Sequence, residues 1–246
     1  MDLSRKFSVV VPMYNEADNA EPLITEIATA IEDEFDAEII VVDDGSSDAT
    51  WQNLLTLSHS ISRLKPIRHK QNKGQSAALV TGIRFARYPW VITLDGDGQN
   101  DPADIPEMIR LLAAKSHFHE NYLIAGNRRK RKDTWLKRIS SRVANNVRSR
   151  LLQDDCMDTG CGLKIFPRDI FLRLPHFNHM HRFLPYLFKL YQVPIANIKV
   201  NHRPRQSGCS KYGFHDRLWA GIVDIIGVLW LKARNCHVEA EVPERV

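Results

Sequence analysis

The sequence lacks any apolar run long enough to cross a membrane. A spanning helix needs about 18–20 predominantly apolar residues, and the nearest candidate, Leu218 to Leu231, is interrupted by Asp224. The N-terminal stretch also lacks the run of about 7–15 apolar residues that a signal peptide requires. We therefore expect the chain of 246 residues to be neither exported nor anchored by a spanning helix.

Cysteine is scarce, and its spacing follows no known framework. The four cysteines, Cys156, Cys161, Cys209 and Cys236, form no CxxC pair. This argues against the disulfide scaffold of a small secreted protein, whose cysteines are dense and regularly spaced. We interpret all four as reduced thiols in a cytoplasmic setting.

Acidic residues are nearly absent from residues 128–150, which we call the basic block. The block holds ten Lys or Arg and a single acid, Asp133, so it carries +9 although the whole chain carries +5. Its one aromatic residue, Trp135, offers no stacking platform for nucleobases, which argues against nucleic acid as the partner. The charge favours a lipid phosphate or an anionic membrane surface instead.

Apolar strands alternate with amphipathic helices through the first half of the chain. Strands are expected at 7–11, 38–42, 64–68 and 90–94, with helices between them, the third over roughly 75–87. This pattern predicts an α/β fold with a mostly parallel sheet and helices on both faces. After residue 160 we expect strands at CGLKIF and IANIKV and a buried helix at RFLPYLFKLY.

Each of three predicted strands ends in a polar cluster: PMYNE (12–16), DDGSSD (43–48) and DGDGQ (95–99). Ligands bind at the carboxyl ends of parallel strands, so the clusters should share one crevice. Asp95 and Asp97 lie on the same side of an extended backbone, and two carboxylates suit Mg²⁺ or Mn²⁺ that takes its remaining ligands from phosphate and water. The spacing therefore predicts a metal-bound diphosphate.

These three clusters, in this order, resemble the motifs of family-2 glycosyltransferases, which are inverting enzymes with a nucleotide-binding α/β domain of the A type. The later segments AGNRRKRKDTWLKRISSRVAN (125–145), DTGCGLKIF (158–166) and HRPRQSGCSKYG (202–213) are similar to those of the polyprenyl-phosphate hexose synthases. That branch includes dolichol-phosphate mannosyltransferase and its undecaprenyl-phosphate relatives. The resemblance covers roughly residues 7–231.

The resemblance implies roles for particular residues. For the nucleotide-sugar they are Pro12, Tyr14, Glu16, Asp43, Asp44, Asp95, Arg205 and Lys211, and the sequence does not separate Asp43 from Asp44 as the nucleoside contact. The implied metal shell is Asp95, Asp97 and Gln99. The acceptor phosphate would be held by Arg128, Arg138 and Ser141, with Ser140 as the alternative to Ser141. The implied catalytic set is Asp97, Asp158 and Arg205.

Three further features of the sequence need an interpretation. For Asp158 we expect a positioning role, because an acceptor phosphate needs little deprotonation. Arg182 is expected to reach the donor, the acceptor or a carboxylate such as Asp158. His176, His179 and His181 lack the spacing of a metal site and are interpreted as loop or helix-start histidines.

The function that follows is inverting transfer of one sugar from a UDP- or GDP-linked donor to a polyprenyl phosphate, aided by Mg²⁺ or Mn²⁺. An alternative is transfer to a hydroxyl of a glycan, and a less favoured one is a nonenzymatic nucleic-acid-binding protein. We expect a peripheral protein on the cytoplasmic face of the inner membrane, and the sequence leaves a homo-oligomer open.

The C-terminal stretch reads as a separate element. We predict a catalytic domain over 1–213 and an amphipathic, membrane-interfacial helix with a tail over 214–246. On a helix, Trp219, Ile222, Val223, Ile226 and Trp230 would share one face. Packing of this face on the core or on a second subunit is the alternative.

Overall fold

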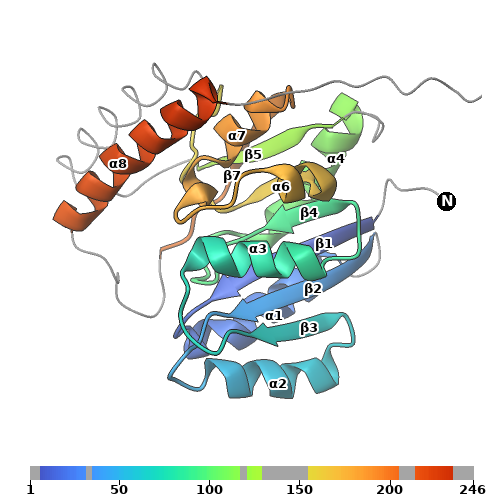
Figure 1. Ribbon diagram of the computed structural model, residues 1–246. Helices are drawn as coiled ribbons and strands as arrows, with labels where there is room; N and C mark the ends of the chain where they lie inside the picture. Colours follow the sequence, from blue (N-terminus) through green and yellow to red (C-terminus); the bar gives the residue numbers. More distant parts are fainter. Residues whose placement is uncertain (1–5, 32–34, 117–120, 129–154, 205–213, 235–246) are drawn as a thin grey trace, which may run out of the picture. The chain divides into compact units, whose positions relative to one another are not determined.

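The computed structural model describes residues 6–31, 35–116, 121–128, 155–204 and 214–234 (Figure 1). The chain divides into two compact units, Met1–Cys209 and Ser210–Val246, which we describe separately. The predicted domains, 1–213 and 214–246, stay a prediction.

The first unit is built from alternating strands and helices, as an α/β fold requires. Its strands are β1 (Lys6–Met13), β2 (Asp36–Asp43), β3 (Leu64–Arg68), β4 (Trp90–Thr93), β5 (Leu123–Arg128), β6 (Lys164–Pro167) and β7 (Ile195–Val200). Its α-helices are α1 (Ala17–Ala30), α2 (Thr50–Ser60), α3 (Gln75–Phe85), α4 (Ile105–Ser116), α6 (Arg168–Arg173) and α7 (Leu184–Leu190). Two short 3₁₀ turns, η2 (Pro102–Asp104) and η3 (Met180–Arg182), precede α4 and α7.

The described strands form one sheet in the order β3-β2-β1-β4-β6-β5-β7. The four N-terminal strands are mutually parallel, and β5 is parallel to β7. Strand β6 is antiparallel to both of its neighbours, β4 and β5. Because β2, β1 and β4 are adjacent and parallel, their carboxyl ends lie at the same edge, as the sequence predicts.

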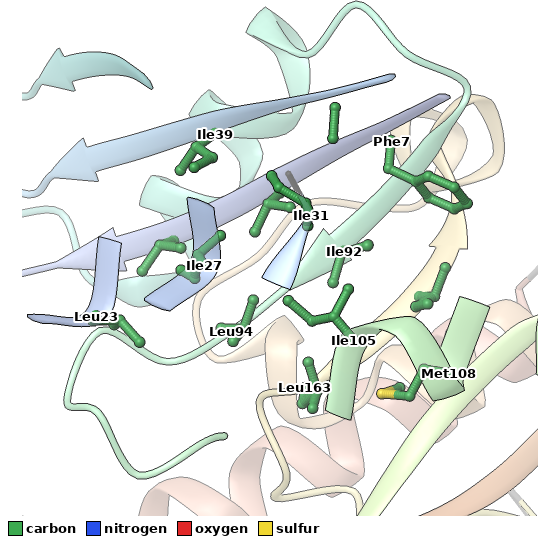
Figure 2. Close-up of a cluster of buried hydrophobic side chains, with 14 of the residues drawn as sticks. Phe7, Leu23, Ile27, Ile31, Ile39, Ile92, Leu94, Ile105, Met108 and Leu163 are labelled. Carbon is green, nitrogen blue, oxygen red and sulfur yellow. The ribbon is translucent and has the colours of Figure 1, made fainter. Parts of the chain in front are cut away.

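The core fills both faces of the sheet. On one face α1 and α4 cover the strands, and Figure 2 shows the packed side chains Phe7, Leu23, Ile27, Ile31, Ile39, Ile92, Leu94, Ile105, Met108 and Leu163. On the other face α3 lies so close that a Cβ at Gly82 would stand 2.5 Å from a methyl group of Val10. Helices on both faces are therefore confirmed.

Several predicted boundaries differ from those observed. Strands 64–68 and 195–200 begin and end as predicted, but β6 begins only at Lys164 because Asp158–Gly162 form a turn rather than part of a strand. The helix expected from Arg182 begins at Leu184, because Met180–Arg182 form a 3₁₀ turn and His179 is left-handed, with φ of 64°.

The second unit contains α8 (Phe214–Ala233), a helix of 20 residues. Val223, Ile226 and Trp230 are exposed on it, whereas Val228 is buried. The side chains of residues 214–222, Trp219 and Ile222 among them, lie outside the described residues. Within the part of the chain that the structure describes, no helix has the length and apolar character needed to cross a bilayer.

Candidate active site

The three polar clusters at the ends of β1, β2 and β4 are joined to one another. The main-chain nitrogen of Asn15, after β1, donates to Ser46 Oγ, after β2, at 2.8 Å. After β4, Gly96 lies against the end of β1, since a Cβ there would stand 2.5 Å from the carbonyl oxygen of Pro12. Only glycine permits this approach. The clusters therefore form one rigid edge, as their sequence positions predict.

Asp44 is buried and shapes the loop between β3 and α3. It accepts hydrogen bonds from the main-chain nitrogens of Lys73 (2.9 Å) and Gly74 (2.7 Å), and its Oδ1 lies 2.7 Å from His69 Nδ1. Gly74 has a φ of 86°, which favours glycine at this position. Asp44 therefore holds the start of α3 beside the site.

Asp43 is also buried, but its two oxygens differ. Oδ1 accepts from the main-chain nitrogen of Ser46 at 2.9 Å. Oδ2 lies 3.1 Å from Arg68 Nε without the alignment of a hydrogen bond. Asp43 thus has one oxygen that lies near a positive charge but accepts no hydrogen bond. Both oxygens of Asp44, in contrast, accept hydrogen bonds from the loop between β3 and α3.

The remaining predicted nucleoside residues lie on the same edge. Pro12 is buried at the end of β1, and Tyr14 is half-buried after it. Glu16 is buried and accepts from Asn19 Nδ2 at 2.6 Å, while its main-chain nitrogen donates to Thr50 Oγ1 at 2.9 Å. Their contacts with a nucleotide stay a prediction.

Asp95 stands at the centre of the edge, held from several sides. Its Oδ1 accepts from Gln75 Nε2 at 2.7 Å, and its main-chain nitrogen donates to Asn100 Oδ1 at 3.1 Å. A Cβ at Gly162 would stand 2.3 Å from this carboxyl group, so any larger residue would displace it. Asp97 Oδ1 accepts from the main-chain nitrogen of Gln99 at 3.2 Å.

Burial, followed by repulsion from Asp97, raises the pKa of Asp95 to about 6. The positive charges of Lys164 and Arg128 and the hydrogen bond from Gln75 oppose this rise. A carboxyl group whose pKa is raised by a neighbouring carboxylate marks a place where a cation is favourable. The donor chemistry of Asp95 and Asp97 thus fits a divalent cation.

Gln99 connects this loop to the end of β7. Its side-chain Nε2 donates to the carbonyl oxygen of Arg203 at 3.4 Å, and the main-chain nitrogen of Arg203 donates back to Gln99 O at 2.9 Å. The Arg203 guanidinium also bonds Asp101 at 2.7 Å and Glu26 at 2.6 Å. A role for Gln99 as a metal ligand stays a prediction.

Arg128 and Asp158 form a bidentate ion pair beside this loop. Arg128 Nε and Nη2 donate to the two Asp158 carboxylate oxygens at 2.6 and 2.7 Å. Burial alone would lower the pKa of Arg128, but the bonds to Asp158 outweigh it and raise the pKa. Arg128, which is predicted to hold the acceptor phosphate, and Asp158, which is predicted to be catalytic, therefore lie in direct contact.

The histidine-containing segment packs on the start of α3. His181 Nδ1 lies 2.8 Å from Ser76 Oγ, and burial followed by the charge of Arg182 lowers the pKa of His181 to about 3. His181 is therefore neutral at physiological pH. Asp158 is paired with Arg128, and the alternatives for Arg182, which are the donor, the acceptor or a carboxylate such as Asp158, stay predictions.

Four predicted residues, Arg138, Ser141, Arg205 and Lys211, lie outside the described residues, as does Ser140. The sequence reading missed three others: Gln75, Gly162 and Lys164. Lys164 carried a usable signal, since it is a lone charge within the apolar run Leu163–Phe166. Gln75 and Gly162 carried none, because each acts through a contact far away in the sequence.

The arrangement offers two carboxylates for a cation at the end of β4 and a paired guanidinium at the end of β5. Among the described residues, no group of three or more His, Cys, Asp or Glu side chains forms a metal site. Two carboxylates fill only part of the coordination shell of Mg²⁺ or Mn²⁺, and the oxygens of a diphosphate can supply other ligands. The site therefore suits a phosphorylated donor and an anionic acceptor.

Known proteins resemble the chain in sequence and in fold. The model of the glycosyl transferase family 2 matches residues 8–174. The dodecaprenyl-phosphate galacturonate synthase of Rhizobium johnstonii is 37% identical over 243 residues, which are 95% of this chain and 70% of that protein.

Solved structures of glucosyl-3-phosphoglycerate synthase from Mycobacterium tuberculosis share the fold. One, in complex with Mn²⁺, UDP-glucose and glycerol 3-phosphate, has a TM-score of 0.70 at 19% identity and covers 93% of this chain and 80% of its own. Another, with Mg²⁺ and UDP, also has a TM-score of 0.70, at 19% identity, and covers 93% of this chain and 79% of its own.

Proposed function

Because the chain belongs to glycosyl transferase family 2 and is a glycosyltransferase, we propose that it transfers one sugar from a nucleotide-sugar to a polyprenyl phosphate. An oxygen of the acceptor phosphate attacks the anomeric carbon, and the bond from that carbon to the nucleoside diphosphate breaks. The products are a nucleoside diphosphate and a sugar-phosphate diester of the lipid, with the anomeric configuration inverted.

The observation that carries the acceptor proposal is the 37% identity, over 95% of the chain, to a dodecaprenyl-phosphate galacturonate synthase. The placement of Arg128 supports it, because this guanidinium lies close enough to act on Asp95 in the loop 95–99 (the Asp95 loop), where an acceptor phosphate would meet the donor. A phosphomonoester with a second pKa near about 6 is largely dianionic at neutral pH and needs little help from a base. Transfer to a glycan hydroxyl would need a base.

We propose that Asp95 and Asp97 hold Mg²⁺ or Mn²⁺, with Gln99 as a third oxygen donor. When bound, the cation offsets negative charge on the departing diphosphate. Gln75 keeps the Asp95 carboxylate in one orientation, and Gly162 leaves it no room to turn away. The chain's own residues thus fix one ligand before the donor binds.

We further propose that α8 lies on an anionic membrane surface, with the protein peripheral to the cytoplasmic face of the inner membrane. Val223, Ile226 and Trp230 recur at helical spacing and are exposed, and exposed Lys232 and Arg234 follow them. A helix of this kind binds the lipid interface through its apolar face and its cations. It would bring the enzyme to an acceptor confined to the bilayer. A homo-oligomer stays a prediction.

The test is a panel of UDP- and GDP-linked sugars, neutral and uronic, incubated with purified protein, Mn²⁺ and undecaprenyl phosphate, with products identified by mass. Each donor is incubated separately, and we expect one of them to yield a lipid-linked sugar, which identifies the donor. Glycan acceptors without a phosphate serve as the comparison. A product that forms only on a glycan hydroxyl would favour the alternative enzyme. Salt-sensitive binding of nucleic acid with no sugar transfer would restore the nonenzymatic alternative.

A further inference from the structure

Lys164 is a lysine inside a buried strand. It opens β6, is 3% exposed, and lies between Leu163 and Ile165, which are fully buried. In the antiparallel register it stands opposite Thr93 of β4, the strand that leads into Asp95. Burying an ammonium group is costly unless hydrogen bonds satisfy it. The hydrogen-bond partners of Lys164 therefore indicate why the strand contains a charged side chain at this position.

The partners of Lys164 are main-chain oxygens of one turn. Its Nζ donates to the carbonyl oxygen of Thr159 at 3.2 Å and also to that of Cys161. From the neighbouring strand, Thr93 Oγ1 donates to the carbonyl oxygen of Gly162 at 2.7 Å. Two side chains of the sheet thus gather three carbonyl groups of the Asp158–Gly162 turn.

This turn joins the two halves of the site. At its start Asp158 holds the Arg128 guanidinium through two hydrogen bonds. At its end Gly162 presses on the Asp95 carboxyl group, where an added Cβ would stand only 2.3 Å away. A displacement of the turn would therefore move the proposed acceptor side relative to the proposed metal side.

We propose that Lys164 is a positioning residue that fixes the Asp158–Gly162 turn against the Asp95 loop, and thereby sets the place of Arg128 and Asp158 relative to the donor. The expected effect of Lys164 on catalysis rests on the proposed function. Its expected effect on the position of the turn does not. Lys164 touches neither reacting group, and although its charge also acts on Asp95, we expect its main effect to pass through the turn to Asp158.

The first test is hydrogen–deuterium exchange of Lys164→Met, which removes the three N–H donors but keeps most of the apolar volume. We expect the amide of Cys161, which donates to the carbonyl oxygen of Asp158 at 3.1 Å, to exchange at least about 10-fold faster, because the turn opens locally, while the amides of β1 stay unchanged. Lys189→Met is the matched control, since Lys189 is paired with Asp155 at the surface. Unchanged exchange in the turn would contradict the proposal.

The second test is a double-mutant cycle with Asp158→Asn. Lys164→Met alone should lower kcat by about 10–100-fold, as loss of a supporting residue commonly does. If Lys164 acts through Asp158, the kcat of the double variant should be within about 3-fold of that of Asp158→Asn, because both substitutions then remove the same contribution. If the fold-losses in kcat of the two single variants instead multiply in the double variant, the proposal is wrong. Lys164→Arg, which keeps a charged donor, should retain most of the wild-type kcat.

If Lys164→Met does not fold, Lys164→Gln, which keeps two N–H donors, replaces it in both tests with smaller expected effects. If no variant that lacks the amine or guanidinium folds, Lys164 serves folding in general and the proposal is wrong. A wild-type protein that transfers no sugar to polyprenyl phosphate would contradict the proposed function, whereas the exchange rates would still decide the role of Lys164.

Discussion

Asp158 uses both carboxylate oxygens to hold one guanidinium. The side chains of Asp158 and Arg128 are each 11% exposed, so the pair is shielded from water. Protonating Asp158 would leave a mostly buried guanidinium without its counter-charge, which is strongly unfavourable. A carboxylate in this position is a poor general base. The geometry thus supports the expectation that Asp158 positions other groups.

We predict that Asp158→Asn lowers the plateau of the pH–rate profile but keeps both of its limbs. Loss of the charged partner should also lower the free energy of unfolding by about 1–3 kcal/mol. Asp155→Asn is the control, because Asp155 pairs with Lys189 at the surface and its side chain is 70% exposed. Disappearance of one limb in Asp158→Asn would show that Asp158 is a base after all.

We predict that Asp97→Asn leaves the fold intact and lowers turnover by at least about 100-fold, because one of two anionic ligands for the cation is lost. The residual activity should require more Mn²⁺. Circular dichroism and a Mn²⁺ titration of activity measure the two effects, with Asp169→Asn, on the exposed side of α6, as control. Unchanged turnover at low Mn²⁺ would refute the assignment.

At the residue scale, the sequence predicted that the clusters after β1, β2 and β4 lie together, but not what each of their residues bonds. Asp95 and Asp97 were recognisable because their spacing itself carries the chemistry. Asp43 and Asp44 were not separable, since the partners of Asp44 come from the loop 69–74, whose path depends on the whole fold. The pairing of Arg128 with Asp158 joins residues 30 positions apart, which local pattern does not reveal.

At the scale of elements, the parallel half was predictable because apolar strands and amphipathic helices alternate there with local periods. The antiparallel insertion of β6 between β4 and β5 was not, because its pairs, such as Trp90 with Pro167, are far apart in the sequence. The period of a strand says which face is buried, but it does not say which strand lies next to it.

Helix α8 provides a prediction at the same scale. Replacing Ile226 and Trp230 with Ser should release the protein from anionic liposomes and raise KM for undecaprenyl phosphate, while a short water-soluble acceptor is spared. Phe85→Ser is the matched control, because Phe85 is similarly exposed but belongs to the first unit. Equal loss with both acceptors, or unfolding, would mean that this face packs on protein.

At the scale of the whole molecule, one half-buried histidine, His181, should make stability depend on pH. The pKa of His181 in the folded protein is about 3, below the ordinary value of 6.5, because burial and then Arg182 disfavour its charged form. The unfolded chain therefore binds this proton first as the pH falls. The contribution of neutral His181 to the free energy of unfolding is complete above pH 6.5. It is lost progressively as the pH falls from about 6.5 to 3.

We predict that protonation of His181 in the unfolded chain lowers the free energy of unfolding by about 2 kcal/mol as the pH falls from 7 to 5. In His181→Gln this part of the pH dependence should disappear, whereas His59→Gln, on the exposed face of α2, should retain it. Urea unfolding at the two pH values measures the difference. An equal loss of stability in wild type and His181→Gln would show that His181 is not the group responsible.

In the proposed reaction the acceptor is the phosphate of a lipid, and an oxygen of this phosphate receives the sugar. Phosphorus-31 NMR of undecaprenyl phosphate during turnover tests it directly, with the donor that the panel identifies. We expect the phosphomonoester signal to be replaced by a phosphodiester signal as nucleoside diphosphate appears in equal amount. Nucleoside diphosphate that appears while the monoester signal stays unchanged would contradict it.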